Sequence, residues 1–219
     1  MTYRPSVLEK LERKLRPYAV RNLMLYIVCA MATVYVLDYL LYPRFQFTAS
    51  HWLFFSRDAI FAGQVWRLVT FIIVPSHDNF VFVALSLYLD YLVGSALQNQ
   101  WGSVKFNLYY LCGMVGAIIS GLITGFTTNM YLNMSLFFAF AIIYPNFELM
   151  VMMLLPVKVK FLAILSGISV LLSLIASGWD DRLAIVMSLA NVALFFWKDV
   201  YNLIHNAYRR YQWKKNWRR

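Results

Sequence analysis

The chain has 219 residues, of which 61% are hydrophobic and 14% charged, and its formal net charge is +10. Soluble domains are about 45–50% apolar and about 25% charged, so this composition excludes an ordinary soluble fold and indicates a protein that lies in lipid. At about 20 residues per membrane-spanning helix, the length allows five to seven spans and leaves no room for a separate soluble domain.

Residues 1–21 are predicted to form a basic amphipathic helix on the membrane surface, and a solvated tail is the alternative. Apolar side chains recur there at helical spacing, at Val7, Leu8, Leu11 and Leu15. The first span is predicted at residues 22–41, ended by Pro43. The loop that follows, to about residue 78, is apolar but interrupted by charged residues, glycine and proline. Each apolar piece is too short to cross, so we expect a long, partly inserted loop.

Five further spans are predicted, which makes six in all. They lie at residues 79–97, 106–124, 131–144, 161–176 and 183–197. Residues 147–160 are expected to form a loop with a hydrophobic dip, and residues 198–219 a basic cytoplasmic tail. The third span carries a row of small residues at four-residue spacing, which permits close helix packing in lipid. This row consists of Gly113, Ala117, Gly121 and Gly125.

The distribution of positive charge predicts the orientation. With six spans and an internal N-terminus, the inner segments hold 16 of the 20 Lys and Arg residues and the outer loops hold 4. This excess predicts that both termini are cytoplasmic, and a bacterial inner membrane is the simplest location. Charges at the chain ends and in short loops also favour membrane lipids, including anionic headgroups, as partners, and argue against nucleic acid.

Two cysteines, Cys29 and Cys112, lie inside apolar stretches without metal-ligand spacing. We therefore expect no disulfide framework, no metal and no cofactor. Asp90 is the most informative polar residue of the spans, because an ionised carboxylate at the membrane centre costs at least ~2.5–3.5 kcal/mol. Ser86 and Gly94 share its helix face, which should point into the bundle. Two interpretations of Asp90 fit this position. It forms a polar partner site or proton-sensitive switch, or it is a structural carboxyl group that bonds a Tyr or Asn of a neighbouring helix.

Three segments resemble the rhomboid intramembrane proteases and the related derlins. Residues 63–70 (GQVWRLVT) resemble the Trp-Arg motif in the long first loop of that family, and residues 94–106 (GSALQNQWGSVKF) resemble the junction of its second and third helices. Residues 155–157 (LPV) are similar to the start of its fifth helix. The resemblance covers about residues 50–200 and implies an all-α, six-helix rhomboid-like bundle. Trp66 and Arg67 are then expected to fix the first loop by stacking and by hydrogen bonds to backbone carbonyls.

The resemblance also identifies where catalytic groups should lie. Rhomboid proteases carry a serine within Gly-x-Ser-Gly on the fourth helix and a histidine base on the sixth, and the serine is a poor nucleophile without that base. Ser135 matches the serine without its flanking glycines, and Ser188 stands where the base should be. Counting back from Gly102 places Phe82 and Ser86 at the oxyanion-stabilising positions of the second helix.

None of these positions retains the family's chemistry. Phe82 has no donor, so a stabilisation usually worth ~3 kcal/mol per donor would be largely missing. The three histidines, His51, His77 and His205, lie outside the fourth and sixth spans. The polar residues of these spans could instead form a hydrogen-bonded lock where the dyad would be. This set consists of Asn133, Ser135, Ser188 and Asn191.

The leading hypothesis is a catalytically inactive rhomboid-like protein that binds transmembrane segments of client proteins, for retention or quality control. An atypical intramembrane serine protease that uses Ser135 is the alternative. A small solute or lipid conduit that uses Asp90 is a third possibility, supported by the buried charge alone.

Overall fold

A computed structural model describes residues 17, 19–45, 47–76, 79–151, 155–176, 178 and 182–196. Most of the predicted N-terminal segment and all of the predicted C-terminal tail therefore lie outside the described residues. The same holds for His77 and His205, so the structure says nothing about them.

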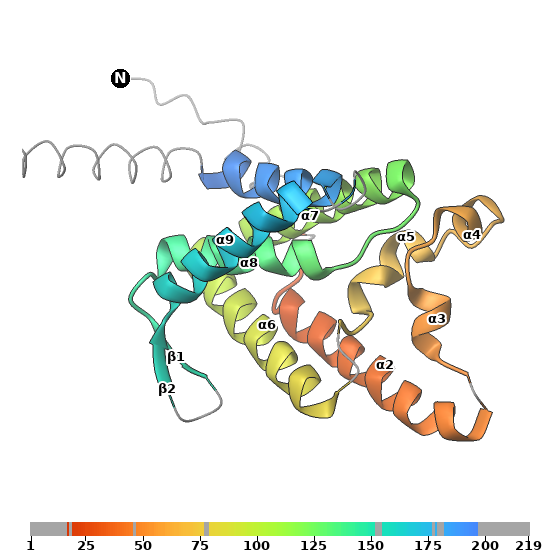
Figure 1. Ribbon diagram of the computed structural model, residues 1–219. Helices are drawn as coiled ribbons and strands as arrows, with labels where there is room; N and C mark the ends of the chain where they lie inside the picture. Colours follow the sequence, from red (N-terminus) through yellow and green to blue (C-terminus); the bar gives the residue numbers. More distant parts are fainter. Residues whose placement is uncertain are drawn as a thin grey trace, which may run out of the picture.

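Six apolar helices occupy the six segments in which spans are predicted (Figure 1). They are α2 (Leu23–Phe45), α6 (Phe80–Trp101), α7 (Ser103–Thr124), α8 (Met130–Ile143), α9 (Val159–Ala176) and a helix at Arg182–Phe196. Four of them, α2, α6, α7 and α9, are long and apolar enough to cross a membrane. The other two are shorter apolar helices.

Asparagine and glycine set the boundaries of α6 and α7, whereas Pro43 does not end α2. Helix α2 continues through Pro43 to Phe45, beyond the predicted end at residue 41. A proline in the last turn removes only one hydrogen bond, and the chain completes that turn. The side chain of Asn79 accepts the backbone N–H of Val81 at 3.0 Å and so caps α6. Gly102, with φ of +80°, separates α6 from α7.

The predicted loop at residues 147–160 is instead a β-hairpin. Strand β1 (Glu148–Val151) pairs antiparallel with β2 (Leu155–Lys158), with Glu148 opposite Lys158, and α9 follows directly. Pro156 is tolerated because both strands of a two-stranded ribbon are edge strands. The segment is partly buried, as the expected hydrophobic dip implies, because Leu149 joins the main core. The all-α prediction therefore holds apart from this hairpin.

The first loop is folded into four short helical segments. They are α3 (Ala49–Leu53), α4 (Arg57–Phe61), α5 (Arg67–Thr70) and the 3-10 helix η2 (Phe71–Ile73). Phe55, Ile60 and Phe71 of this loop are buried together and pack against apolar residues of α7. The loop thus has a small core of its own, which a solvated connection would lack.

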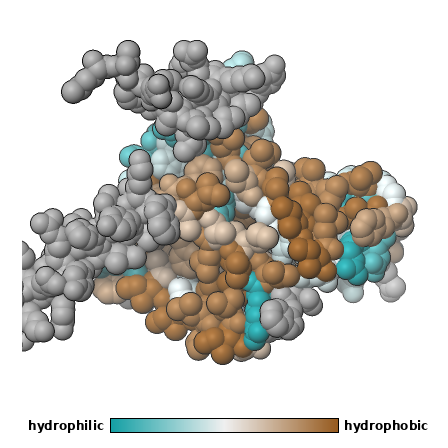
Figure 2. Space-filling view, turned by 90° about the horizontal axis from the view of Figure 1, so that it is seen from above, coloured by the Kyte–Doolittle hydropathy of each residue, from teal (hydrophilic) through white to brown (hydrophobic). Residues whose placement is uncertain are grey.

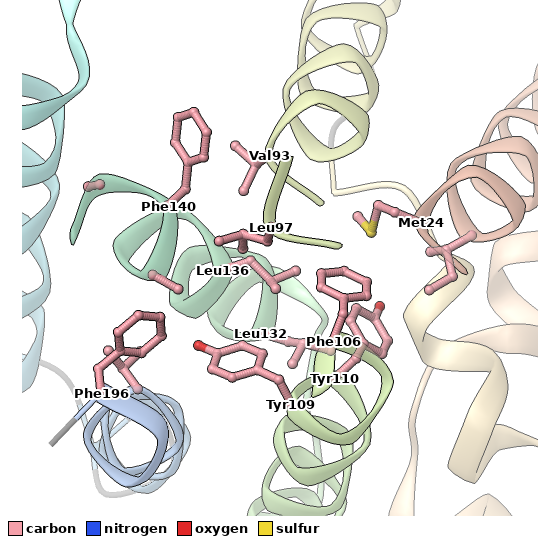
Figure 3. Close-up of a cluster of buried hydrophobic side chains, with 14 of the residues drawn as sticks. Met24, Val93, Leu97, Phe106, Tyr109, Tyr110, Leu132, Leu136, Phe140 and Phe196 are labelled. Atoms are coloured by element: carbon pink, nitrogen blue, oxygen red, sulfur yellow. The ribbon is translucent and has the colours of Figure 1, made fainter. Parts of the chain in front are cut away.

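The main core lies where α2, α6, α7, α8 and the Arg182–Phe196 helix meet (Figure 3). Tyr109 is fully buried there, and its ring contacts Trp101 and Phe195. The face of the molecule seen in Figure 2 is largely apolar where it is coloured. Many large apolar side chains are exposed to the outside, and Ile175 and Leu194 are each 74% exposed. Apolar surface on this scale suits lipid as the surrounding solvent.

Candidate functional site

The Trp-Arg motif closes the C-terminal end of α3. Arg67 is only 5% exposed, and its Nη1 donates to the carbonyls of His51 at 3.0 Å and Phe54 at 2.8 Å. Its Nε donates to Oε1 of Gln64 at 2.6 Å, and the guanidinium lies 4.9 Å from the centre of the Phe54 ring. A guanidinium suits this place, because it offers several donors in one plane and stacks on aromatic rings.

Two neighbours of Arg67 complete this contact. Trp66 Nε1 donates to the carbonyl of Trp52 at 3.2 Å, and Thr70 Oγ1 donates to the carbonyl of Leu53 at 2.9 Å. With Arg67, these side chains therefore satisfy the four consecutive carbonyls of residues 51–54. The last carbonyls of a helix have no partner within it, and positive charge is favourable there. The hydrogen bonds expected of Trp66 and Arg67 are present, and sequence reasoning missed the role of Thr70.

The far end of the first loop is held by Asn129, the residue before α8. Its Nδ2 donates to the carbonyls of Ile72 at 3.0 Å and Val74 at 2.9 Å, and its Oδ1 accepts the hydroxyl of Ser76 at 3.0 Å. Asn129 was not singled out from the sequence. An asparagine directly before an apolar helix is a capping signal, but the partners of its side chain lie more than 50 residues away.

Ser135 and Ser188 line one small cavity of about 10 Å³, roughly enough for a single water molecule. Ser135 is fully buried on α8, and its hydroxyl donates to the carbonyl of Leu132 at 2.7 Å. The Ser188 hydroxyl donates to the carbonyl of Tyr131 at 2.7 Å. Both protons are therefore directed at the backbone of α8. The shared cavity is consistent with the expectation that Ser188 stands where the base for Ser135 should be, but neither serine is paired with a base in the described residues.

The proposed lock of four polar side chains does not form as one network. Within the described part of the chain, Asn133 donates to Oδ2 of Asp90 at 3.1 Å, whereas Asn191 donates to the carbonyl of Tyr109 at 3.3 Å. The residues instead tie three different helix pairs together: α8 to α6, the Arg182–Phe196 helix to α7, and, through Ser188, that helix to α8. Successive residues of a helix are rotated by about 100°, so Asn133 and Ser135 point in roughly opposite directions.

The bond between Asn133 and Asp90 matches the structural alternative expected for this carboxyl group, an Asn on a neighbouring helix. We predict that Asn133→Leu destabilises the protein by about 1–3 kcal/mol, because the carboxyl group loses its donor in a water-poor environment. The double variant Asp90→Leu with Asn133→Leu should recover most of this loss. Denaturation in mixed micelles of the two single variants and the double variant measures the coupling, and strictly additive effects would contradict it.

The residues at the oxyanion-stabilising positions do not converge on Ser135. Phe82 is half exposed on the outer surface of α6, and the hydroxyl of Ser86 donates to the carbonyl of Val83 on the same helix at 2.9 Å. His51 contributes its backbone carbonyl to Arg67, and its ring lies 5.3 Å from that of Phe54. No group of three or more possible metal ligands occurs within the described ranges.

The small-residue row of α7 contacts several partners. A Cβ added at Gly113 would lie 2.3 Å from Cδ1 of Leu132 on α8, and one at Gly121 would lie 2.6 Å from Cε1 of Phe55 in the first loop. Gly125 does not belong to the row. It has φ of +100° and ends α7, with its N–H donating to the carbonyl of Gly121 at 2.8 Å. Gly125 therefore corrects the prediction, because it turns the chain instead of packing a helix.

Taken together, the apolar helices, the apolar outer faces and the folded first loop define a multi-pass helical membrane protein. Its described polar side chains mostly bond backbone carbonyls and hold elements together. Comparison of the sequence with protein-family models and with curated proteins finds no match.

Proposed function

We propose that the chain is a rhomboid-like protein with six spans and both termini in the cytoplasm, placed in a bacterial inner membrane. It lacks the Ser/His dyad and binds transmembrane segments of client proteins, for retention or quality control. Two features support this reading most directly: the first loop anchored by Trp66 and Arg67, and the absence of a base beside Ser135 among the described residues.

The state of Ser135 carries the proposal. A nucleophilic serine needs a base that accepts its proton, and a neighbouring hydroxyl cannot serve as one. The Ser135 hydroxyl donates to the carbonyl of Leu132. The other polar residues that line its cavity carry hydroxyl groups only: Thr127, Thr128, Tyr131 and Ser188. The cavity has room for roughly one water, which is too little for a peptide bond.

The short helices support binding of transmembrane segments. Helix α8 has 14 residues and is therefore about 21 Å long, whereas the hydrocarbon core of a bilayer is about 30 Å thick. Such a mismatch thins the surrounding bilayer. Marginally apolar client helices are then less penalised beside this protein than in the bulk membrane.

Photo-crosslinking in membranes tests client binding. Single-pass proteins should crosslink to the wild type and be lost with Arg67→Ala, because the anchored first loop would no longer hold its position beside the helices. Arg57→Ala is the matched control, since Arg57 lies in the same loop but its side chain is 40% exposed. Amounts are compared at equal quantities of monodisperse protein. Failure to capture any single-pass protein with the wild type would contradict client binding.

A fluorophosphonate probe separates this proposal from the protease alternative. We expect no labelling of the wild type, because the Ser135 hydroxyl is buried and has no base beside it in the described structure. Labelling of the wild type that disappears in Ser135→Ala would replace the proposal with an intramembrane serine protease. Ser56→Ala, at a half-buried serine of the first loop that lies outside the cavity, is the control for non-specific loss of labelling.

A further inference from the structure

We propose that a cavity between α2, the first loop and α7 holds an acyl chain of one anionic phospholipid, whose headgroup lies at Arg21 and Lys105. This assigns a defined lipid site, which goes beyond general contact of the basic chain ends with the membrane. It does not depend on client binding or on the rhomboid resemblance.

The cavity has the size and lining of a ligand site. Its volume is about 390 Å³, within the range of roughly 300–1,000 Å³ typical of small-molecule sites. Three elements supply its apolar walls. They contribute Leu23 and Ile27 from α2, Val69 and Ile72 from the first loop, and Leu111 and Met114 from α7. Leu111 and Val69 are each about half exposed, so the cavity is open to the side, where lipid chains have access.

Two polar side chains line the cavity, and both have an unsatisfied buried atom. Nδ2 of Asn107 donates to the carbonyl of Val20 at 3.3 Å, which leaves its Oδ1 without a partner. The hydroxyl of Tyr110 is also buried without a partner, and Tyr110 is 4% exposed. A phospholipid carries ester carbonyls and phosphate oxygens next to its acyl chains, and these accept the hydrogen bond that Tyr110 can donate. A purely apolar occupant would leave the hydroxyl unsatisfied.

Two basic residues, Arg21 and Lys105, are direct chain neighbours of residues that line the cavity. Arg21 directly follows Val20, and Lys105 directly follows Val104; both valines line the cavity and both basic residues are exposed. Neither residues 19–30 nor residues 101–114 contain an acidic residue, and the acidic Asp90 of α6 interacts electrostatically with Tyr110. An amphiphile with an apolar chain and a negative headgroup therefore complements the apolar walls, the Tyr110 hydroxyl and the two basic side chains together. A client helix would complement the walls alone.

Native mass spectrometry of the full chain, purified in mild detergent, tests the site. The protein is first delipidated, then phosphatidylglycerol or phosphatidylcholine is added, and the bound lipid molecules are counted. We expect the wild type to retain one phosphatidylglycerol in preference to phosphatidylcholine. Arg21→Gln and Lys105→Gln should each reduce this preference about fivefold, which corresponds to about 1 kcal/mol per basic side chain near a membrane surface.

Two substitutions fill the cavity from opposite walls, so that misfolding of one does not decide the result. Leu111→Trp and Val69→Trp should both lower retention of phosphatidylglycerol. Ile119→Trp is the matched control, because Ile119 is an exposed residue of the same helix that does not line the cavity. Equal retention of both lipids by the wild type would overturn the headgroup assignment. Unchanged retention in both folded cavity-filling variants would overturn the site.

Discussion

Arg67→Ala is expected to lower the free energy of unfolding by about 3 kcal/mol or more. The substitution removes hydrogen bonds to the carbonyls of His51 and Phe54 and to Gln64, and each bond to a charged group contributes roughly 1.5–3 kcal/mol. It also removes the cation above the Phe54 ring. Because these bonds close the end of α3, the first loop should come loose before the helix bundle unfolds. Thermal unfolding in detergent and limited proteolysis of the loop measure the two effects.

Two variants separate the geometry of this contact from its charge. Arg67→Lys keeps the positive charge but cannot direct several donors from one plane, so we expect it to retain only part of the stability. Arg57→Ala removes a longer and more exposed bond, from Nη1 to the carbonyl of Ile123 at 3.3 Å, and should cost no more than about 1 kcal/mol. Equal losses in the Arg67→Ala and Arg57→Ala variants would contradict the proposed role of the motif.

The positions of the helices could be predicted because apolar length is a local property of the sequence. All six predicted spans coincide with a helix to within a few residues. Whether the two shorter helices cross the bilayer depends on their surroundings, which local hydropathy does not describe. The hairpin at Glu148–Lys158 was missed because four-residue strands are too short for a clear alternation and Pro156 argues against a strand.

The polar contacts were predictable in kind but not in their partners. Arg67 was expected to bond carbonyls, yet the choice of His51 and Phe54 depends on how the loop folds back on itself. In the same way, the bond between Asp90 and Asn133 depends on how α6 and α8 are rotated about their axes. The rotation between Asn133 and Ser135 follows from helix geometry alone, and applying it would have excluded the single four-residue lock.

For the small residues of α7, too, sequence spacing predicted only part of what the structure shows. A row at four-residue spacing predicts close packing, and Gly113 and Gly121 do lie against other elements. The spacing also included Gly125, which ends the helix. A glycine just after the last helical residue is a common helix-ending signal, because it adopts the left-handed conformation without strain, and here that signal outweighs the spacing. Gly116, outside the row, has ordinary contacts only, with its nearest neighbour at 3.5 Å.

Gly121→Ala and Gly116→Ala should therefore change stability in opposite directions. Both substitutions remove a glycine from α7, Gly116 from its interior and Gly121 from its last turn, which favours the helix by up to about 1 kcal/mol. At Gly121 the new Cβ would lie 2.6 Å from Cε1 of Phe55 and 2.9 Å from Cγ2 of Thr127, and such overpacking typically costs about 1–3 kcal/mol. We expect a net loss for Gly121→Ala and a small gain for Gly116→Ala. Gly121→Leu should be far more damaging, because the larger side chain would separate the first loop from α7.

A compensating substitution tests whether Phe55 is the cause. Phe55 is fully buried against Phe71, and the two rings meet edge to face at 5.8 Å. Phe55→Leu alone should be destabilising, because it removes part of a packed aromatic pair. Combined with Gly121→Ala, it should cost less than the sum of the two single changes, because the shorter side chain makes room for the added methyl group. Additive losses would mean that Phe55 does not set the spacing between α7 and the first loop.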